Sequence, residues 1–291
     1  MIYIVVPTYN REVICKKFVA MLEKQTFQDY KLILVDHGKH KVDLYENEKI
    51  KVIKSDVNGW ARAVNVGLKY ILTISQNADD IVLVINDDVY LENNYLSKIE
   101  ECINEKPNSI IGTCCINKKN NKTLRVSIKI DKIKAKNIYL YKGIDFNSIP
   151  DGYLESELLT GKGVVIPVDV FKCIGLYNEE KLPHYKADHE LIWRAKKSGI
   201  SVYVTNKLIL YTYADQKRVK STETYLENMK KMFFSMTSTY NLKDLVNYSF
   251  VSFDNIYAIY YILLNFFRYI LFNTADYFKA KRIEIESEWY K

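Results

Sequence analysis

Short apolar runs alternate with amphipathic stretches along the first hundred residues. Runs rich in β-branched side chains are typical of buried strands in a parallel sheet. They predict strands at residues 2–6, 31–36, 49–56 and 81–86. The amphipathic stretches predict helices at residues 12–23, 60–74 and 95–104. This order predicts an α/β fold with a mostly parallel, Rossmann-like sheet that is flanked by helices.

The middle of the chain is less regular. We expect further strands at 109–116, 124–130, 158–167, 201–205 and 207–213. We expect a short helix from residue 168 and a longer helix that ends at Gly199, both between the predicted strands at 158–167 and 201–205. After about Ser221 the pattern is helical to the end. We therefore divide the chain into an α/β domain at residues 1–220 and a C-terminal helical region at residues 221–291.

Composition narrows the class of protein. The chain has 291 residues, 48% hydrophobic and 26% charged, which is ordinary for a folded protein. Its five cysteines include no CxxC pair, so we expect reduced thiols in the cytoplasm and neither a disulfide frame nor a zinc site. We expect no signal peptide, because a strand pattern begins at once. The net charge of +7 suits an anionic partner, but no nucleic-acid-binding module is present, so we expect no nucleic acid.

Acidic side chains follow three of the predicted strands, at Asp36, Asp56 and Asn86-Asp87-Asp88. In sheets of this kind, ligands bind beyond the carboxyl ends of the strands. The adjacent carboxylates of Asp87 and Asp88 suit a hard divalent cation such as Mg²⁺ or Mn²⁺. The alternative is an acidic turn with no ligand, since Asn and Asp are common in turns.

Two further segments offer ligand-binding groups. Asp36 suits the imide N–H of a uracil or thymine ring, unless it merely starts the turn before Gly38. Arg62 and Asn65 lie one helical turn apart and are able to reach a ribose or a phosphate. The alternative is an ordinary polar helix face.

A second acidic cluster, at Asp188-His189-Glu190, opens the longer helix. It supplies a carboxylate separate from the first cluster, although Asp188 would also be stabilised there by the helix dipole alone. His184 and His189 are five residues apart, which is not the spacing of a helical metal pair, so we expect no zinc site. No nucleophile elbow or Cys-His pattern is present.

Several of these segments together resemble family 2 glycosyltransferases of the GT-A fold, over roughly residues 1–213. The resemblance rests on six motifs in order and register, which are VVPTYNRE, LVDHG, NGWARAVNVG, INDDV, LLTGKGVVIP and HYKADHELIWRAKKSG. It implies a nucleotide-sugar site in which a Pro7-Thr8-Tyr9 loop and Asp36 hold the base. It further implies roles for the remaining motif residues: Arg62 and Asn65 line the nucleotide pocket, Asp88 binds the metal, Asp87 lies near the ribose or metal, Gly161 and Gly163 allow close approach of the sugar or acceptor, and Asp188 is the base.

The activity implied is transfer of a hexosyl or deoxyhexosyl group, with inversion, from a UDP- or dTDP-sugar to a hydroxyl of a bacterial surface glycan such as capsule or O-antigen. Inversion needs one base for the acceptor hydroxyl, and a Mn²⁺ or Mg²⁺ ion stabilises the leaving diphosphate. A sugar-phosphate nucleotidyltransferase is one alternative, but PTYNRE lacks its glycine-rich loop. A non-catalytic relative is another, but it should have lost Asp88 or Asp188.

Three departures from the family pattern are visible. His37 stands where many relatives have a second acidic residue. No His follows the last strand, where only Asp215 offers a substitute ligand. Only Trp193-Arg194 follows the base, without a QxxRW motif, so we expect a non-processive enzyme.

Residues 256–272 form the most hydrophobic run. Its polar residues fall on one helical stripe, made of Asp254, Tyr261, Asn265, Arg268 and Asp276. One interpretation is a helix in the surface of a membrane, with Lys279, Lys281 and Arg282 on anionic headgroups. The other is a helix packed on the first domain or in a homodimer. A central arginine disfavours a true span.

The first interpretation places the enzyme on the inner face of the cell membrane, with a lipid-linked glycan as acceptor. The basic residues between 118 and 136 would then meet the diphosphate of that acceptor, unless they are simply a solvated basic face.

Overall fold

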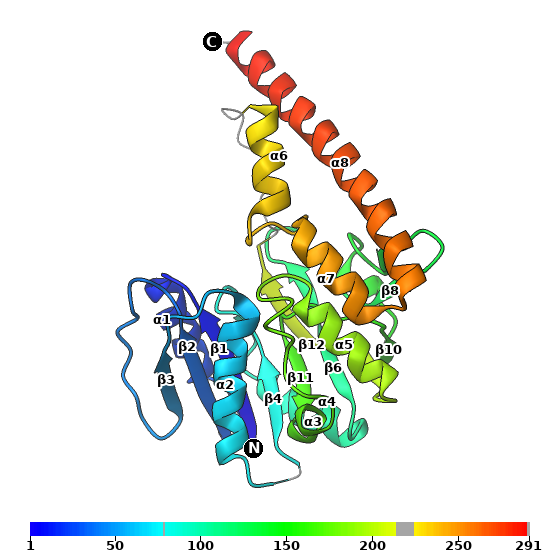
Figure 1. The fold of residues 1–291 in the computed structure, drawn as a ribbon. Helices are drawn as coiled ribbons and strands as arrows, with labels where there is room; N and C mark the ends of the chain where they lie inside the picture. Colours follow the sequence, from blue (N-terminus) through cyan, green and yellow to red (C-terminus); the bar gives the residue numbers. More distant parts are fainter. Residues whose placement is uncertain (78, 214–223, 290–291) are drawn as a thin grey trace.

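The computed structural model describes residues 1–77, 79–213 and 224–289, and from residue 280 on it describes the backbone alone. Ten strands form one sheet in the order β10-β12-β6-β11-β4-β1-β2-β3, with β5 and β7 paired to its side. Helices cover both faces of this sheet (Figure 1). The predicted α/β architecture with a C-terminal helical extension is confirmed.

The first half of the sheet is parallel. It contains β1 (Ile2–Thr8), β2 (Tyr30–Asp36), β3 (Ile50–Lys54) and β4 (Ile81–Val84). β1 pairs with β2 and β4, and β2 pairs with β3, always in parallel register. Their carboxyl ends therefore meet at one edge, as the sequence predicts.

The second half of the sheet is mixed. It contains β5 (Tyr90–Leu91), β6 (Ile110–Asn117), β7 (Thr123–Arg125), β10 (Tyr153–Glu155), β11 (Val164–Pro167) and β12 (Val202–Thr212). β11 lies antiparallel between β4 and β6, and β12 runs parallel to β6. The sheet is thus mixed, with its antiparallel pairings confined to this half.

Four of the predicted strands are corrected. Residues 124–130 are not one strand but the end of β7 and the start of β8 (Ile128–Asp131), which forms a hairpin with β9 (Lys136–Tyr139). Residues 158–163 form a loop, and only β11 is a strand there. The two last strands are one, β12, with an irregularity in register between Thr205 and Ile209.

Two hydrophobic cores lie on opposite faces of the sheet. On one face the buried apolar residues of α1 (Glu12–Leu22) and α3 (Tyr95–Glu105) belong to the same core as Ile4 and Leu32. On the other face those of α2 (Trp60–Ile74), α4 (Val168–Ile174) and α5 (Ala187–Lys197) belong to the same core as Val5 and Ile33. Successive strand residues point to opposite faces, so both faces of β1 and β2 must be apolar, as they are.

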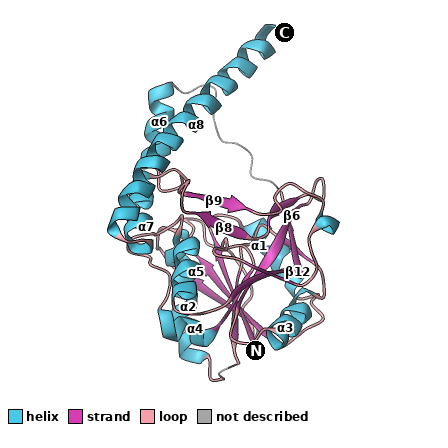
Figure 2. Cartoon of the chain, turned by 90° about the vertical axis from the view of Figure 1, so that its right-hand side faces the viewer, coloured by secondary structure: helices cyan, strands magenta, loops and turns pink. Residues whose placement is uncertain are grey.

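The C-terminal helices are α6 (Tyr225–Phe234), α7 (Leu242–Ser252) and α8 (Asn255–Trp289). α7 is fixed to α5, because the Trp193 indole N–H donates to the Ser252 carbonyl at 2.8 Å. α8 extends away from the sheet with α6 beside it (Figures 1 and 2). The expected domain boundary at residues 220 and 221 lies outside the described residues, and the boundary stays a prediction.

Candidate active site

Polar side chains gather at the carboxyl ends of the parallel strands. Thr8 ends β1 and is level with Asp36, which ends β2. Asn86, Asp87 and Asp88 directly follow β4. The edge predicted from the sequence is therefore real, and a ligand above it would face carboxylates from two strand ends.

Asp87 is an internal anchor of this edge. Its side chain is only 3% exposed. One carboxylate oxygen accepts a hydrogen bond from the Thr8 hydroxyl at 2.7 Å, and the other accepts from the Arg11 guanidinium at 3.2 Å. Burial raises the pKa of Asp87, and the bonds from Thr8 and Arg11 oppose that rise. Asp87 thus ties the loop after β1 to the end of β4.

Asp88 faces outward and is paired with two cations. Its side chain is one third exposed, and the Lys162 ammonium lies 3.3 Å from both of its oxygens. The Arg11 guanidinium lies 3.7 Å away. Oδ1 of Asp88 is buried and accepts no hydrogen bond. The arrangement leaves one oxygen of Asp88 available to a further ligand, beside two fixed positive charges.

Trp60 joins three loops at the site. Its indole N–H donates to the Asn86 side-chain oxygen at 2.9 Å. Its ring lies against Gly161 so closely that a Cβ atom there would come within 2.5 Å of it. Its backbone N–H donates to Nδ1 of His184 at 3.1 Å. Burial lowers the pKa of His184, and a neutral ring with Nδ1 as acceptor carries its proton on Nε2.

Asp188 lies in the first turn of α5, half-buried. Its Oδ2 accepts from the Gly161 backbone N–H at 3.0 Å, and its Oδ1 accepts from the His189 backbone N–H at 2.9 Å. Both bonds orient the carboxylate, which lies at the positive end of the helix dipole. Each oxygen still has a lone pair for another donor. The geometry therefore suits a carboxylate that is oriented by the protein and able to accept one more proton donor.

Two of the predicted nucleotide-binding residues already have protein partners. Asp36 is fully buried, and its oxygens accept from the backbone N–H groups of Gly38 at 3.0 Å and Val42 at 2.5 Å. Asn65 is 1% exposed and bonds the backbone of Tyr177 as donor at 2.9 Å and as acceptor at 3.1 Å. Both shape the loops around the site, and their contact with a nucleotide stays a prediction.

The other predicted nucleotide-binding residues lie nearer the surface. Tyr9 is 44% exposed, and its ring lies 5.2 Å from that of His37. Arg62 donates to the Asn58 carbonyl at 3.2 Å. Asn65 instead donates to the Tyr177 carbonyl, so the hydrogen bonds described here do not join these two side chains.

One detail of the expected base-binding loop is wrong. Pro7 and Thr8 do not lie in a loop but are the last two residues of β1, level with Val35 and Asp36. The pairing of β1 with β4 ends at Val5, which leaves room on that side for a residue without an N–H.

A cation at Asp88 would have few protein ligands. Within residues 1–77, 79–213 and the described side chains of the C-terminal helices, no group of three His, Cys, Asp or Glu side chains could hold a metal. Asp215, the substitute ligand considered above, lies outside the described residues. Oδ1 of Asp88 accepts no hydrogen bond and is paired only with the Lys162 ammonium, and it nonetheless fits a magnesium-like ion, which is commonly held by one or two carboxylates together with substrate phosphates.

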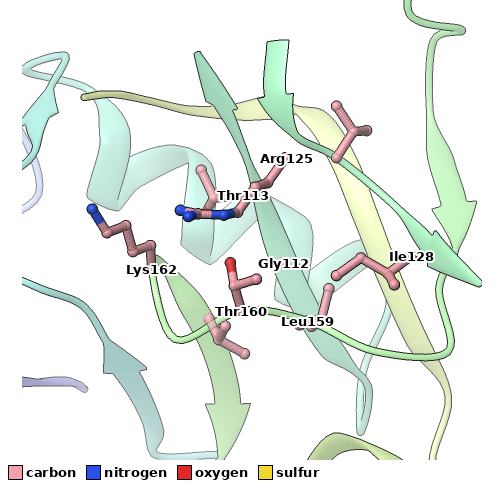
Figure 3. A pocket seen from close by; sticks show the side chains of 9 residues that line it. Gly112, Thr113, Arg125, Ile128, Leu159, Thr160 and Lys162 are labelled. Carbon is pink, nitrogen blue, oxygen red and sulfur yellow. The ribbon is translucent and has the colours of Figure 1, made fainter. Parts of the chain in front are cut away.

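A small cavity lies next to the Asp88–Lys162 ion pair, on the side of β6 and β11. Arg125 and Lys162 both line it, together with Thr113 and Thr160 (Figure 3). Its volume of about 10 Å³ holds about one water molecule. It is therefore not where a nucleotide would lie, and the strand edge remains the candidate site.

Sequence reasoning missed three residues that organise the site: Arg11, Trp60 and Lys162. Lys162 lies between the two glycines that the motif singles out, and Arg11 is the second-last residue of the first motif. Their positive charges beside an acidic pair were the available signal. Trp60 opens α2 and carried no such signal, because its partners come from three distant loops.

The mixed sheet with this acidic edge and a C-terminal helix is the fold of GT-A glycosyltransferases. The chain belongs to glycosyl transferase family 2, whose model matches residues 3–174, and it is a glycosyltransferase. None of the curated proteins compared with the chain matches it.

Solved structures confirm the fold. GalNAc-T7 with UDP, GalNAc and Mn²⁺ is 11% identical, with a TM-score of 0.57, and the match covers 82% of this chain and 49% of that one. S. aureus TarS 1-349 in complex with UDP-GlcNAc is 14% identical, with a TM-score of 0.53 and coverage of 98% and 92%. The Pyrobaculum calidifontis mannosyltransferase PcManGT with GDP-Man and Mn²⁺ is 10% identical, with a TM-score of 0.51 and coverage of 91% and 73%. This chain thus spans about half the length of the GalNAc-T7 chain.

Proposed function

We propose that this glycosyltransferase moves a hexosyl or deoxyhexosyl group, with inversion, from a UDP- or dTDP-sugar to a hydroxyl of a glycan acceptor. Asp188 is the general base in this proposal. A Mn²⁺ or Mg²⁺ ion on Asp88 holds the diphosphate of the donor. The support is the geometry of this chain together with its family, and relatives of the same fold were solved with UDP, UDP-GlcNAc and GDP-Man.

The observation that carries the proposal is the loop at Gly161 and Lys162. These two adjacent residues each contact one of the carboxylates: the Gly161 N–H bonds Asp188, and the Lys162 ammonium pairs with Asp88. One short loop therefore contacts both carboxylates through two adjacent residues. Transfer with inversion needs this separation of roles, with a base on the acceptor side and positive charge on the donor side.

Asp188 would take the proton of the acceptor hydroxyl as that oxygen forms its bond to the anomeric carbon. The bond from the anomeric carbon to the diphosphate oxygen breaks on the opposite face, and the electron pair leaves with the nucleotide. The two backbone N–H bonds hold the carboxylate in place throughout. A retaining double displacement would need a nucleophile beneath the sugar, and no residue here is assigned that role.

Charge on the leaving diphosphate would be stabilised by Arg11 and Lys162. Both cations are already held at the acidic pair, so little reorganisation is needed when the donor binds. A divalent ion bound through Oδ1 of Asp88 would act as a Lewis acid on the same phosphates. The protein cations and the ion act on one group, so their effects on binding should overlap.

The nucleotide would lie over the ends of β1 and β2. The exposed ring of Tyr9 beside His37 offers a stacking surface for the base. Asp36 and Asn65 shape this pocket from within, and Arg62 lines its side. We assign the ribose to the neighbourhood of Asp87.

The acceptor in this proposal is a lipid-linked precursor of a bacterial surface glycan, and the enzyme works in the cytoplasm at the inner face of the membrane. The basic residues between 118 and 136 include Lys162's neighbour Arg125, which lines the cavity at β6. They would face the acceptor's diphosphate.

The test is calorimetric titration of the full chain with UDP, dTDP, GDP and ADP, each with Mn²⁺ and with EDTA. We expect binding of UDP or dTDP that Mn²⁺ strengthens. Asp88→Ala should abolish the effect of Mn²⁺, whereas Asp56→Ala, at the same edge with a side chain 98% exposed, should not. Absence of binding to every nucleotide would overturn the proposal in favour of a non-catalytic relative.

A further inference from the structure

Helix α8 has its polar stripe turned inward. Tyr261 and Asn265 are buried, at 3% and 5% exposure. The Asn265 amide donates to the Ala135 carbonyl at 2.9 Å, and the Arg268 guanidinium donates to the same carbonyl at 3.0 Å and to that of Lys134 at 2.7 Å. The polar stripe identified in the sequence therefore contacts the protein itself at Asn265 and Arg268.

These bonds fix the tip of the β8–β9 hairpin to α8. The Tyr260 hydroxyl also donates to the Ile133 carbonyl at this tip. Ile133 is 83% exposed. Lys132, Lys134 and Lys136 flank it and are exposed as well. The tip thus presents one apolar side chain among three lysines, next to the exposed Tyr260.

The opposite side of α8 is an apolar face open to its surroundings. Its seven members are each at least 41% exposed, and they are Ile256, Ile259, Tyr260, Leu263, Phe267, Leu271 and Phe278. At about 100° per residue they fall within an arc of about 120°, and they extend over about 33 Å of helix. We call these seven residues the α8 apolar face. Apolar patches of this extent mark interaction sites.

We propose that the α8 apolar face and the hairpin tip together dock onto the surface of a membrane that contains anionic lipids. Apolar side chains would enter the boundary between headgroups and acyl chains, as they do in interfacial helices. The three lysines would lie at headgroup level, where each basic residue adds attraction to anionic lipid. The apolar side of α8 would thus meet the membrane, while its polar residues hold the helix to the protein.

Charge argues against a second copy of the chain as the occupant. A two-fold dimer brings the same surface together with itself. The lysines of the two hairpin tips would then be brought close together and would repel each other. The acidic residue at the tip is Asp131, whose carboxylate already accepts from the Lys134 backbone N–H. An anionic bilayer has no such conflict.

Structure also argues against a membrane span. Residues 255–279 are long and apolar enough to cross a membrane, judged by length and composition. Crossing would place Arg268 near the centre of the bilayer and remove its bonds to Ala135 and Lys134. A charge there is expensive. Lying on the surface keeps every one of these bonds.

This docking deepens the proposed function, and its link to a lipid-linked acceptor rests on that proposed function. Docking would hold the strand edge close to the plane where such an acceptor is anchored. The docking itself is measured without donor or acceptor, so it stands or fails separately from the activity.

The experiment is flotation of the full chain with two kinds of vesicle, phosphatidylcholine alone and phosphatidylcholine mixed with phosphatidylglycerol. A double substitution in the apolar face, Leu263→Ser with Phe267→Ser, should lower the fraction bound about tenfold or more. Its matched control is Val13→Ser with Tyr45→Ser, two residues exposed elsewhere, at 67% and 82%. All four side chains are exposed, so the fold should persist in both variants.

A second pair of variants tests the charge. Lys132→Glu with Lys134→Glu should reduce binding to the anionic vesicles, whereas Lys17→Glu with Lys24→Glu changes the net charge equally at exposed sites on and after α1 and should have little effect. UDP titration of every variant is the parallel readout. Lost flotation with intact UDP binding would support docking by this surface, and lost UDP binding with intact flotation would count against the proposed function alone.

Three results would overturn the docking. One is flotation that neither test variant changes. Another is binding to both kinds of vesicle that the lysine substitutions do not change, which would exclude anionic lipid as the partner that the hairpin tip recognises. The third is a dimer in light scattering that Leu263→Ser with Phe267→Ser converts to a monomer, without any flotation of the unaltered chain, which would assign the face to a second copy.

Discussion

Asp244 offers a quantitative test of how the C-terminal helices are built. It lies in the first turn of α7 and is 4% exposed. Its Oδ2 is buried and accepts no hydrogen bond. Burial raises the pKa of Asp244 to about 6, while the positive charges of Lys186 and Lys243 partly oppose the rise. We predict that Asp244→Asn stabilises the protein at neutral and higher pH.

The magnitude follows from the difference in pKa. An unfolded aspartate titrates near 3.9, so the folded state holds this proton about 2 units more tightly, which is worth about 3 kcal/mol. The contribution of this proton to stability is therefore fully present below pH ~4 and is lost as the pH rises from about 4 to about 6. Asparagine resembles the protonated form and escapes this loss. The gain should be close to 3 kcal/mol at pH 8 and about half of that at pH 5.

The assay is thermal unfolding followed by circular dichroism at both pH values. A gain of this size should raise the Tm at pH 8 by about 5 °C or more. The control is Asp43→Asn, an exposed aspartate, which should leave the Tm unchanged. If Asp244→Asn lowered the Tm at pH 8, the Lys186 ammonium would have to stabilise the buried carboxylate more than burial destabilises it, and our reasoning would be refuted.

Three substitutions at the candidate site separate donor binding from transfer. Asp188→Asn keeps an acceptor for the Gly161 N–H, so UDP affinity should persist while release of UDP from the donor falls about 100-fold or more; unchanged turnover would remove Asp188 as the base. Lys162→Met should weaken UDP binding in EDTA by about tenfold, the loss of one charged contact, and equal affinity would exclude Lys162 from the diphosphate site. Gly161→Ala would bring a Cβ within 2.5 Å of the Trp60 ring, so turnover should drop with the Tm nearly unchanged; full activity would mean that Trp60 does not need its position.

The acidic edge shows how far local patterns reach. Asp87 and Asp88 end an apolar run, and parallel strands place such ends together, so the sequence sufficed to locate them. It did not distinguish their roles. Asp87 proves to be buried against Thr8 and Arg11, whereas Asp88 faces outward to Lys162. That division depends on side chains more than seventy residues apart in the chain, whose meeting no local pattern records.

The second half of the sheet shows where periodicity misleads. Residues 158–167 look like one strand, but the loop that bonds Asp188 occupies the first six of them and β11 only the rest. An apolar run signals burial, and both a buried loop and a strand satisfy it. The antiparallel direction of β11 was likewise hidden, because strand direction depends on the connection and not on the strand.

The sequence by itself determined the parallel half of the sheet, its acidic edge and the apolar character of α8, because each follows from the spacing of apolar and polar residues along a single element. Only the tertiary structure decided which way α8 faces. A helical wheel separates the polar stripe of Asn265 and Arg268 from the apolar face, but it is equally compatible with either side packing on the protein. The carbonyl of the buried Ala135 at the hairpin tip accepts from both of those polar side chains, and the carbonyl of Lys134 accepts from Arg268. A buried backbone carbonyl needs such a donor, and this need turns the polar stripe inward and leaves the apolar face outside.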